Sequence, residues 1–117
     1  MFDIAFDPDG ALLRLTIGGF WDEAETTRFV AALRERVTAI RRTHATFDVL
    51  SDARGFAIQS AETSERFGKM AAALTARRTA ILVRSTLNKM QAERNMAGER
   101  LRVFTDEDAA RRWLADG

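Results

Sequence analysis

The chain has 117 residues, 46% of them hydrophobic and 30% charged, and its 18 basic and 17 acidic side chains give a formal net charge of +1. This length fits a single domain, residues 1–117, built around one hydrophobic core, and the balanced charge argues against a nucleic-acid-binding surface. The chain lacks cysteine, which excludes disulfides and thiolate chemistry, and it lacks an apolar run near the ~20 residues that span a bilayer.

The first segment is predicted to form an antiparallel hairpin within residues 2–18. Apolar and polar residues alternate there, which is the pattern of half-buried strands. The sequence DPDG at 7–10 separates the two runs and has the residue preferences of a type I turn. The alternating apolar residues are Phe2, Ile4, Phe6, Leu13, Leu15 and Ile17.

A long helix of about five turns is predicted next, because apolar residues recur there at steps of three and four. Asp22 is a suitable N-cap, and Glu25 follows three residues later as in a capping box. The apolar stripe consists of Phe29, Val30, Leu33, Val37 and Ile40.

A third strand, TFDVLSD at 46–52, is predicted to end at Asp52 and to lead into a turn through Arg54-Gly55. A second helix is expected to begin at about Ser60. Its apolar stripe consists of Phe67, Met70, Ala71 and Leu74.

Two further strand–helix units complete the chain. The apolar run TAILV at 79–83 indicates a strand covered on both faces, and a helix capped by Ser85-Thr86 follows it and ends at Gly98. The last strand is LRVF at 101–104, and TDED at 105–108 is a capping sequence for the last helix.

The predicted order is β-β-α-β-α-β-α-β-α, which indicates an α/β fold. Strands that alternate with helices pair largely in parallel through right-handed crossovers, whereas the N-terminal hairpin is antiparallel. We therefore expect one domain with a mixed sheet and packed helices.

Two segments carry a family resemblance. The strand that ends in Asp52 at a glycine-containing turn before a helix, and the closing LRVFTDEDAARRWL, resemble the STAS domain superfamily, in particular its stand-alone SpoIIAA-like branch. The resemblance implies a STAS/SpoIIAA-like fold and a role in protein interaction or regulation.

In the anti-sigma-factor antagonists of this superfamily, a hydroxyl near the start of the helix is phosphorylated. The resemblance places that motif on Ser60 to Thr63, where Ala61 or Glu62 takes the acceptor position and the glycine of the motif is missing. A shifted alignment would nominate Ser60, Thr63 or Ser64, and helix capping explains the same hydroxyls. We therefore expect no working phosphorylation switch.

The SpoIIAA-like branch also implies an alternative, the binding of an apolar or amphipathic ligand such as a lipid. Core packing or dimer packing is the competing interpretation of the same large apolar residues. The candidates to line such a pocket are Trp21, Phe67 and Met70, together with Phe20, Phe56, Ile58 and Met90. A further alternative is an anion held by Arg54 and the free N–H groups at the start of the helix near Ser60.

No catalytic or metal-binding pattern is found in the sequence. His44 is the single histidine, and the calcium-loop, dinucleotide and P-loop spacings are absent. We expect a protein that is not an enzyme, without cofactor or metal. Its expected partners are an unknown protein, a small apolar ligand, or a second copy in a homodimer.

The candidate partner or ligand surface is the segment between the third strand and the second helix. Because MFDIAFD carries two acids and no basic segment, we expect no signal peptide and a cytoplasmic location. The residues of this surface are Asp52, Arg54, Gly55, Phe56, Ile58 and Ser60.

Overall fold

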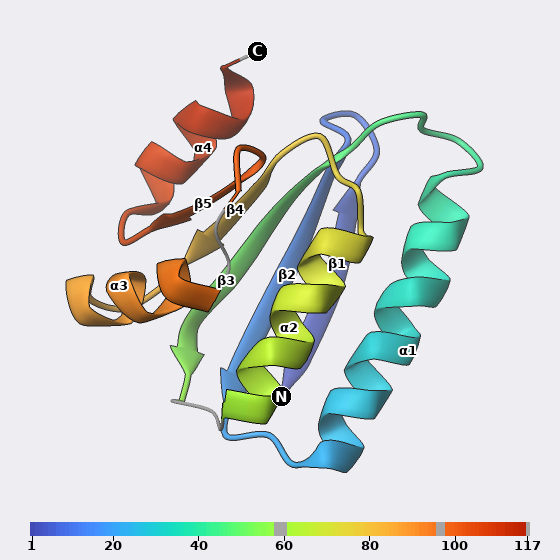
Figure 1. Cartoon of the computed structure of the whole chain (residues 1–117). Helices are drawn as coiled ribbons and strands as arrows, with labels where there is room; N and C mark the ends of the chain where they lie inside the picture. Colours follow the sequence, from blue (N-terminus) through green and yellow to red (C-terminus); the bar gives the residue numbers. More distant parts are fainter. Residues whose placement is uncertain (58–60, 96–97, 117) are drawn as a thin grey trace.

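The computed structural model describes residues 1–57, 61–95 and 98–116. In these residues the predicted order of elements is confirmed (Figure 1). The elements are β1 (Phe2–Asp7), β2 (Leu12–Gly19), α1 (Glu23–Ile40), β3 (Asp48–Phe56), α2 (Ala61–Ala73), β4 (Thr79–Leu82), α3 (Thr86–Asn95), β5 (Leu101–Phe104) and α4 (Glu107–Ala115).

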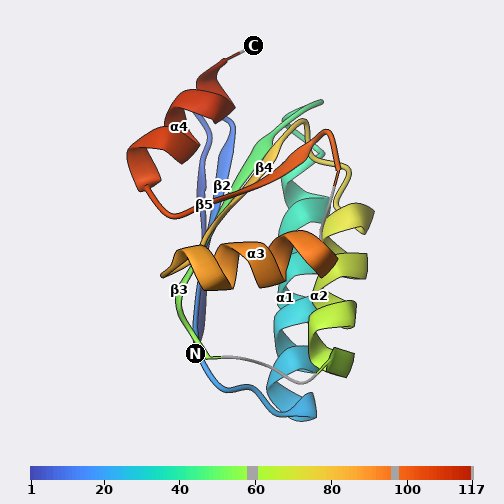
Figure 2. The same ribbon diagram turned by 60° about the vertical axis from the view of Figure 1, so that its left-hand side comes forward.

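The strands form one mixed sheet in the order β1-β2-β3-β4-β5. β1 pairs antiparallel with β2, and the other neighbours pair in parallel, as the hairpin and the strand–helix units predicted. Figure 2 shows α1 and α2 together on one face of the sheet and α4 on the other. Each face of the sheet therefore has its own layer of helix.

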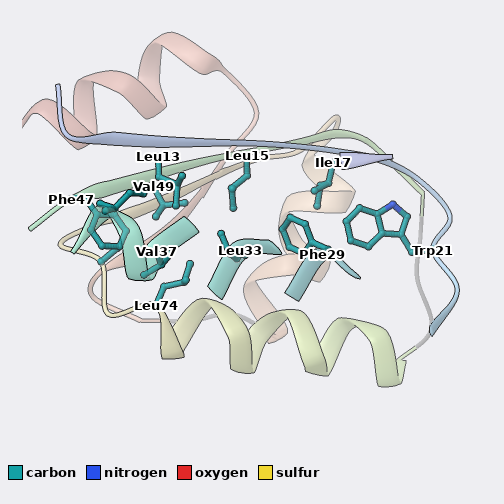
Figure 3. Close-up of a cluster of buried hydrophobic side chains, with 12 residues drawn as sticks. Leu13, Leu15, Ile17, Trp21, Phe29, Leu33, Val37, Phe47, Val49 and Leu74 are labelled. Atoms are coloured by element: carbon teal, nitrogen blue, oxygen red, sulfur yellow. The ribbon is translucent and has the colours of Figure 1, made fainter. Parts of the chain in front are cut away.

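The main core lies between the sheet and α1 with α2 (Figure 3). β2 turns alternate side chains toward α1, so that Leu15 points toward Leu33 and Ile17 toward Phe29, all of them buried. Burying a side chain of this size stabilises the fold by about 1.5–3 kcal/mol. α1 begins where its sequence predicted, because the Asp22 carboxylate accepts a hydrogen bond of 2.8 Å from the backbone N–H of Glu25.

A second core lies on the opposite face, under α4. Leu50 of β3 and Leu82 of β4 pack there against Ala110 and Leu114. On the other face, Ile81 of β4 packs in a third cluster with side chains of β5 and α3. β4 is therefore buried on both faces, as its continuous apolar sequence predicted.

The third strand is longer than predicted. β3 continues to Phe56, so the turn expected at Arg54-Gly55 is wrong. The reason lies in β2, where Gly18 and Gly19 pair with Gly55 and Phe56 beyond an irregularity in the register. A Cβ atom on Gly55 would lie 3.8 Å from the Cα atom of Gly18, so the two strands approach closely at this pair. The backbone partner for this part of β3 therefore comes from a strand more than 30 residues earlier in the chain, which a local pattern cannot reveal.

Candidate functional site

Asp52 lies within β3, and its side chain is on the sheet face opposite α1 and α2. Arg54 lies two residues further along the strand, at the irregularity in the register, and its contacts with Asp52 and Glu107 place its guanidinium on the same face. The Arg54 guanidinium donates two hydrogen bonds to the Asp52 carboxylate, from Nε to Oδ1 at 2.9 Å and from Nη2 to Oδ2 at 2.8 Å. The Asp52 side chain is only 14% exposed, so this pair is partly shielded from water.

The pair belongs to a larger ion-pair cluster that joins β2, β3 and α4. Arg14 of β2 places Nη2 3.5 Å from Asp52 Oδ2 and 3.4 Å from Oε1 of Glu107, the first residue of α4. Arg54 Nη2 lies 3.2 Å from the same Glu107 oxygen, and Arg111 Nε donates to the other at 2.9 Å. Three arginines therefore share two carboxylates.

The electrostatics of the cluster keep both acids ionised. The side-chain hydrogen bond from Arg54 lowers the pKa of Asp52, and this effect outweighs the partial burial that raises it. The pKa of Glu107 is also lowered, first by the hydrogen bond from Arg111 and then by that from Arg14. A carboxylate with a lowered pKa is a poor general acid or base at neutral pH.

The cluster engages the arginine that the anion-site alternative invoked. The guanidinium of Arg54 contacts Asp52 and Glu107 on the α4 face, whereas α2 lies on the other face. The helix start near Ser60 includes residues outside those described, so the anion site stays a prediction.

The aromatic residues predicted near the site lie together on the α1 and α2 side of the sheet. The Trp21 ring centroid is 5.3 Å from that of Phe56 and 5.4 Å from that of Phe67, and those two are 5.2 Å apart. Trp21 is 2% exposed and donates from Nε1 to the Gly18 carbonyl at 2.8 Å. Met70 packs against the same core. We call Trp21, Phe29, Phe56 and Phe67 the aromatic cluster.

Several predicted site residues are placed differently. Phe56 was expected in a loop and is instead the half-buried last residue of β3. Phe20 and Met90 are 69% and 53% exposed, so their side chains do not join the aromatic cluster. Ile58 and Ser60 lie outside the described residues.

An exposed surface remains where β2 and β3 end. Gly19 pairs with Phe56, and the N–H of Ala57 donates to the Gly19 carbonyl at 3.1 Å, so Phe20 follows directly beside the end of β3. We call Phe20, Arg54 and Gly55, all exposed, the carboxyl-end surface. In open α/β sheets, ligands and partners commonly bind at the carboxyl ends of the parallel strands.

Arg14, Glu107 and Arg111 are the cluster residues that the sequence analysis did not single out. Arg14 stands between Leu13 and Leu15, so the alternation of β2 already placed it on the face opposite the main core. Glu107 was interpreted only as an acid at the start of a helix. Its proximity to β3 depends on where α4 packs, for which the sequence carries no local signal.

The part of the chain that the structure covers offers no candidate for metal binding or for spanning a membrane. Among these residues, no group of three or more acidic or histidine side chains is placed to hold a metal ion. In the same residues, the helices are too short or too polar to cross a membrane.

Comparison with known proteins supports the fold. Neither a protein-family model nor a curated protein matches the chain. The chain is similar to the crystal structure of an uncharacterized protein of the DUF3478 family from Shewanella loihica, which has a SpoIIAA-like fold. The TM-score is 0.70 at 18% sequence identity, over 97% of this chain and 92% of that one. The chain therefore has the SpoIIAA-like α/β fold that its sequence resemblance implied.

Proposed function

We propose that the chain is a non-enzymatic protein-interaction or regulatory module that binds its partner through the carboxyl-end surface. The observation that carries the proposal is Phe20, an aromatic side chain 69% exposed beside the end of β3. Aromatic residues and arginine are enriched at the centres of protein interfaces, and Arg54 supplies an exposed guanidinium on the neighbouring strand. The SpoIIAA-like fold agrees with such a role.

The charges of the site support a role without catalysis. Asp52 and Glu107 are held as carboxylates by three arginines, so neither is poised to exchange a proton near neutral pH. The single histidine, His44, lies by the hairpin turn, where Nε2 is 2.9 Å from the Pro8 carbonyl.

The proposed module works without a phosphorylation switch. Ala61 and Glu62 stand at the positions where the resemblance would place the acceptor, and Glu62 lies in the first turn of α2. Intact-mass spectrometry of the protein isolated from its own cells should find the unmodified mass. A phosphate on Ser60, Thr63 or Ser64 would contradict this part of the proposal.

The second candidate function is a carrier or sensor of an apolar ligand. It is favoured by the half-buried rings of Phe56 and Phe67 on the α2 side of the aromatic cluster. Ring centroids about 5 Å apart are in contact, however, so a ligand would have to displace a ring. Native mass spectrometry separates the two functions, because a carrier should retain a co-purified adduct and an interaction module should show the bare mass.

Affinity capture with variant baits tests the proposed surface. Phe20→Asp and Arg54→Ala should each weaken capture of the partner, because they remove the exposed ring and the guanidinium. The matched controls are Leu87→Asp on α3, where the side chain is 63% exposed, and Arg34→Ala on the exposed side of α1. Capture should survive both controls. Equal capture by Phe20→Asp, Arg54→Ala and the unchanged protein would refute the choice of surface.

A further inference from the structure

β1 is an edge strand, and its pairing with β2 determines which of its backbone groups are free. Met1 and Gly18 form a hydrogen-bonded pair, in which the Gly18 N–H donates to the Met1 carbonyl at 3.0 Å. In an antiparallel ladder such pairs alternate with non-bonded pairs, and the register from Phe2 to Asp7 is regular. The N–H and C=O groups of Phe2, Ile4 and Phe6 therefore point away from β2.

These outward groups border a groove between β1 and α1. Ala32, Glu35, Arg36 and Ala39 of α1 line the groove opposite the first residues of β1. The two alanines leave room for a neighbouring chain. Glu35 and Arg36 are exposed, and within the described residues neither forms an ion pair.

We propose that a second copy of this chain binds here by pairing its β1 antiparallel to this one, so that two sheets join into a continuous sheet. The two-fold axis passes between Ile4 and Ile4 of the second copy, and Phe2 lies opposite Phe6. This register uses all of the outward N–H and C=O groups of both edges. The half-buried side chains of Phe2, Ile4 and Phe6 then lose their remaining exposure to water.

The acidic residues of β1 select this register. The side chains of β1 alternate between the two faces of the sheet. Those of Phe2, Ile4 and Phe6 are half-buried on one face, and the exposed side chains on the other face are Asp3, Ala5 and Asp7. In the proposed register Asp3 lies opposite Ala5 of the second copy. A shift of two residues either way would place Asp3 opposite Asp3 or opposite Asp7, and like charges directly opposite each other destabilise a strand pair.

The charges of α1 indicate a second copy rather than another protein. The same two-fold axis brings α1 of one copy toward α1 of the other, where Glu35 of each chain can meet Arg36 of its counterpart. The surface beside the β1 edge carries both an acid, Glu35, and a base, Arg36. It is therefore complementary to the same surface of a second copy, as a two-fold interface requires. The residues of this edge lie outside the carboxyl-end surface. A test that refutes the dimer therefore does not refute the proposed function, and the reverse also holds.

Sedimentation analysis over a wide range of protein concentration tests the dimer. The unchanged protein should dimerise, and Arg36→Glu should raise the dimer dissociation constant about tenfold, because four like charges then meet at the axis. Adding Glu35→Arg to that variant should restore the dimer. Arg34→Glu, the same change on α1 outside the groove, should leave it intact.

Amide hydrogen exchange tests the strand pairing itself. The amides of Ile4 and Phe6 should be protected in the dimer, although β2 does not bond them. The amide of Ala5 is bonded to β2 and serves as an internal control that β1 is folded. A protein that stays monomeric, or a dimer in which Ile4 and Phe6 exchange freely, would overturn the proposal. A monomer would leave this edge open to an extended strand of another protein.

Discussion

The carboxylates of Asp52 and Glu107 make stability depend on pH in acid. Because the pKa of each is lowered in the folded protein, each stabilises the fold at pH values above its ordinary pKa, 3.8 for Asp52 and 4.5 for Glu107. That contribution is lost as the pH falls through the lowered pKa. We expect the free energy of unfolding in urea to decline below about pH 4.5, and to decline less steeply in Asp52→Asn. Parallel pH curves for the two proteins would contradict this.

Two neighbouring aromatic residues have opposite environments, which gives a direct test of the core. Trp21 is 2% exposed inside the aromatic cluster, and Phe20 is 69% exposed. Trp21→Ala should lower the free energy of unfolding by about 3–5 kcal/mol, because it leaves a cavity. Phe20→Ala should change it by less than about 0.5 kcal/mol. Urea denaturation measures both, and similar losses would argue against the position of Trp21.

At the scale of the elements, Arg77 ties α4 to the sheet. It donates from Nε and Nη2 to the Asp48 carboxylate of β3, at 2.8 Å each, and also to the Leu114 carbonyl at the end of α4. A cation at this end also complements the helix dipole.

Arg77→Ala should therefore lower the free energy of unfolding by about 1.5–3 kcal/mol, as expected for hydrogen bonds to a charged group. The matched control is Arg112→Ala, an exposed arginine in the last turn of the same helix. Thermal or urea unfolding compares the two variants. An equal loss of unfolding free energy in both would show that the hydrogen bonds of Arg77 add nothing beyond its positive charge.

The outcome for β3 shows where sequence-based prediction of elements reaches its limit. The start of α1 follows from Asp22 and the apolar stripe after it, because both are local features. The end of β3 does not, since Arg54 and Gly55 have no strand pattern of their own. They are extended because Gly18 and Gly19 of β2 lie alongside and supply backbone partners.

At the scale of the whole molecule, three hydrophobic clusters share one sheet. Trp21 belongs to the core under α1 and α2, and Trp113 packs against the core under α4. Since β3 and β4 contribute to both faces, we expect the cores to unfold together. Trp21→Phe and Trp113→Phe each leave one tryptophan as a probe. In each variant, the fluorescence of the remaining tryptophan should give the same urea midpoint as circular dichroism. A separate, earlier transition at Trp113 would contradict the expectation that the cores unfold together.

The sequence by itself determined the order of the elements, the antiparallel hairpin, the N-cap and apolar stripe of α1, and the resemblance to the SpoIIAA-like fold. These features rest on residues close together in the chain, where spacing and capping act directly. Only the tertiary structure decided that Arg54 and Gly55 belong to a strand and that Phe56 packs in the aromatic cluster. Arg54 lies 53 residues from its partner Glu107, and a contact at that separation exists only because α4 packs on the same face of the sheet.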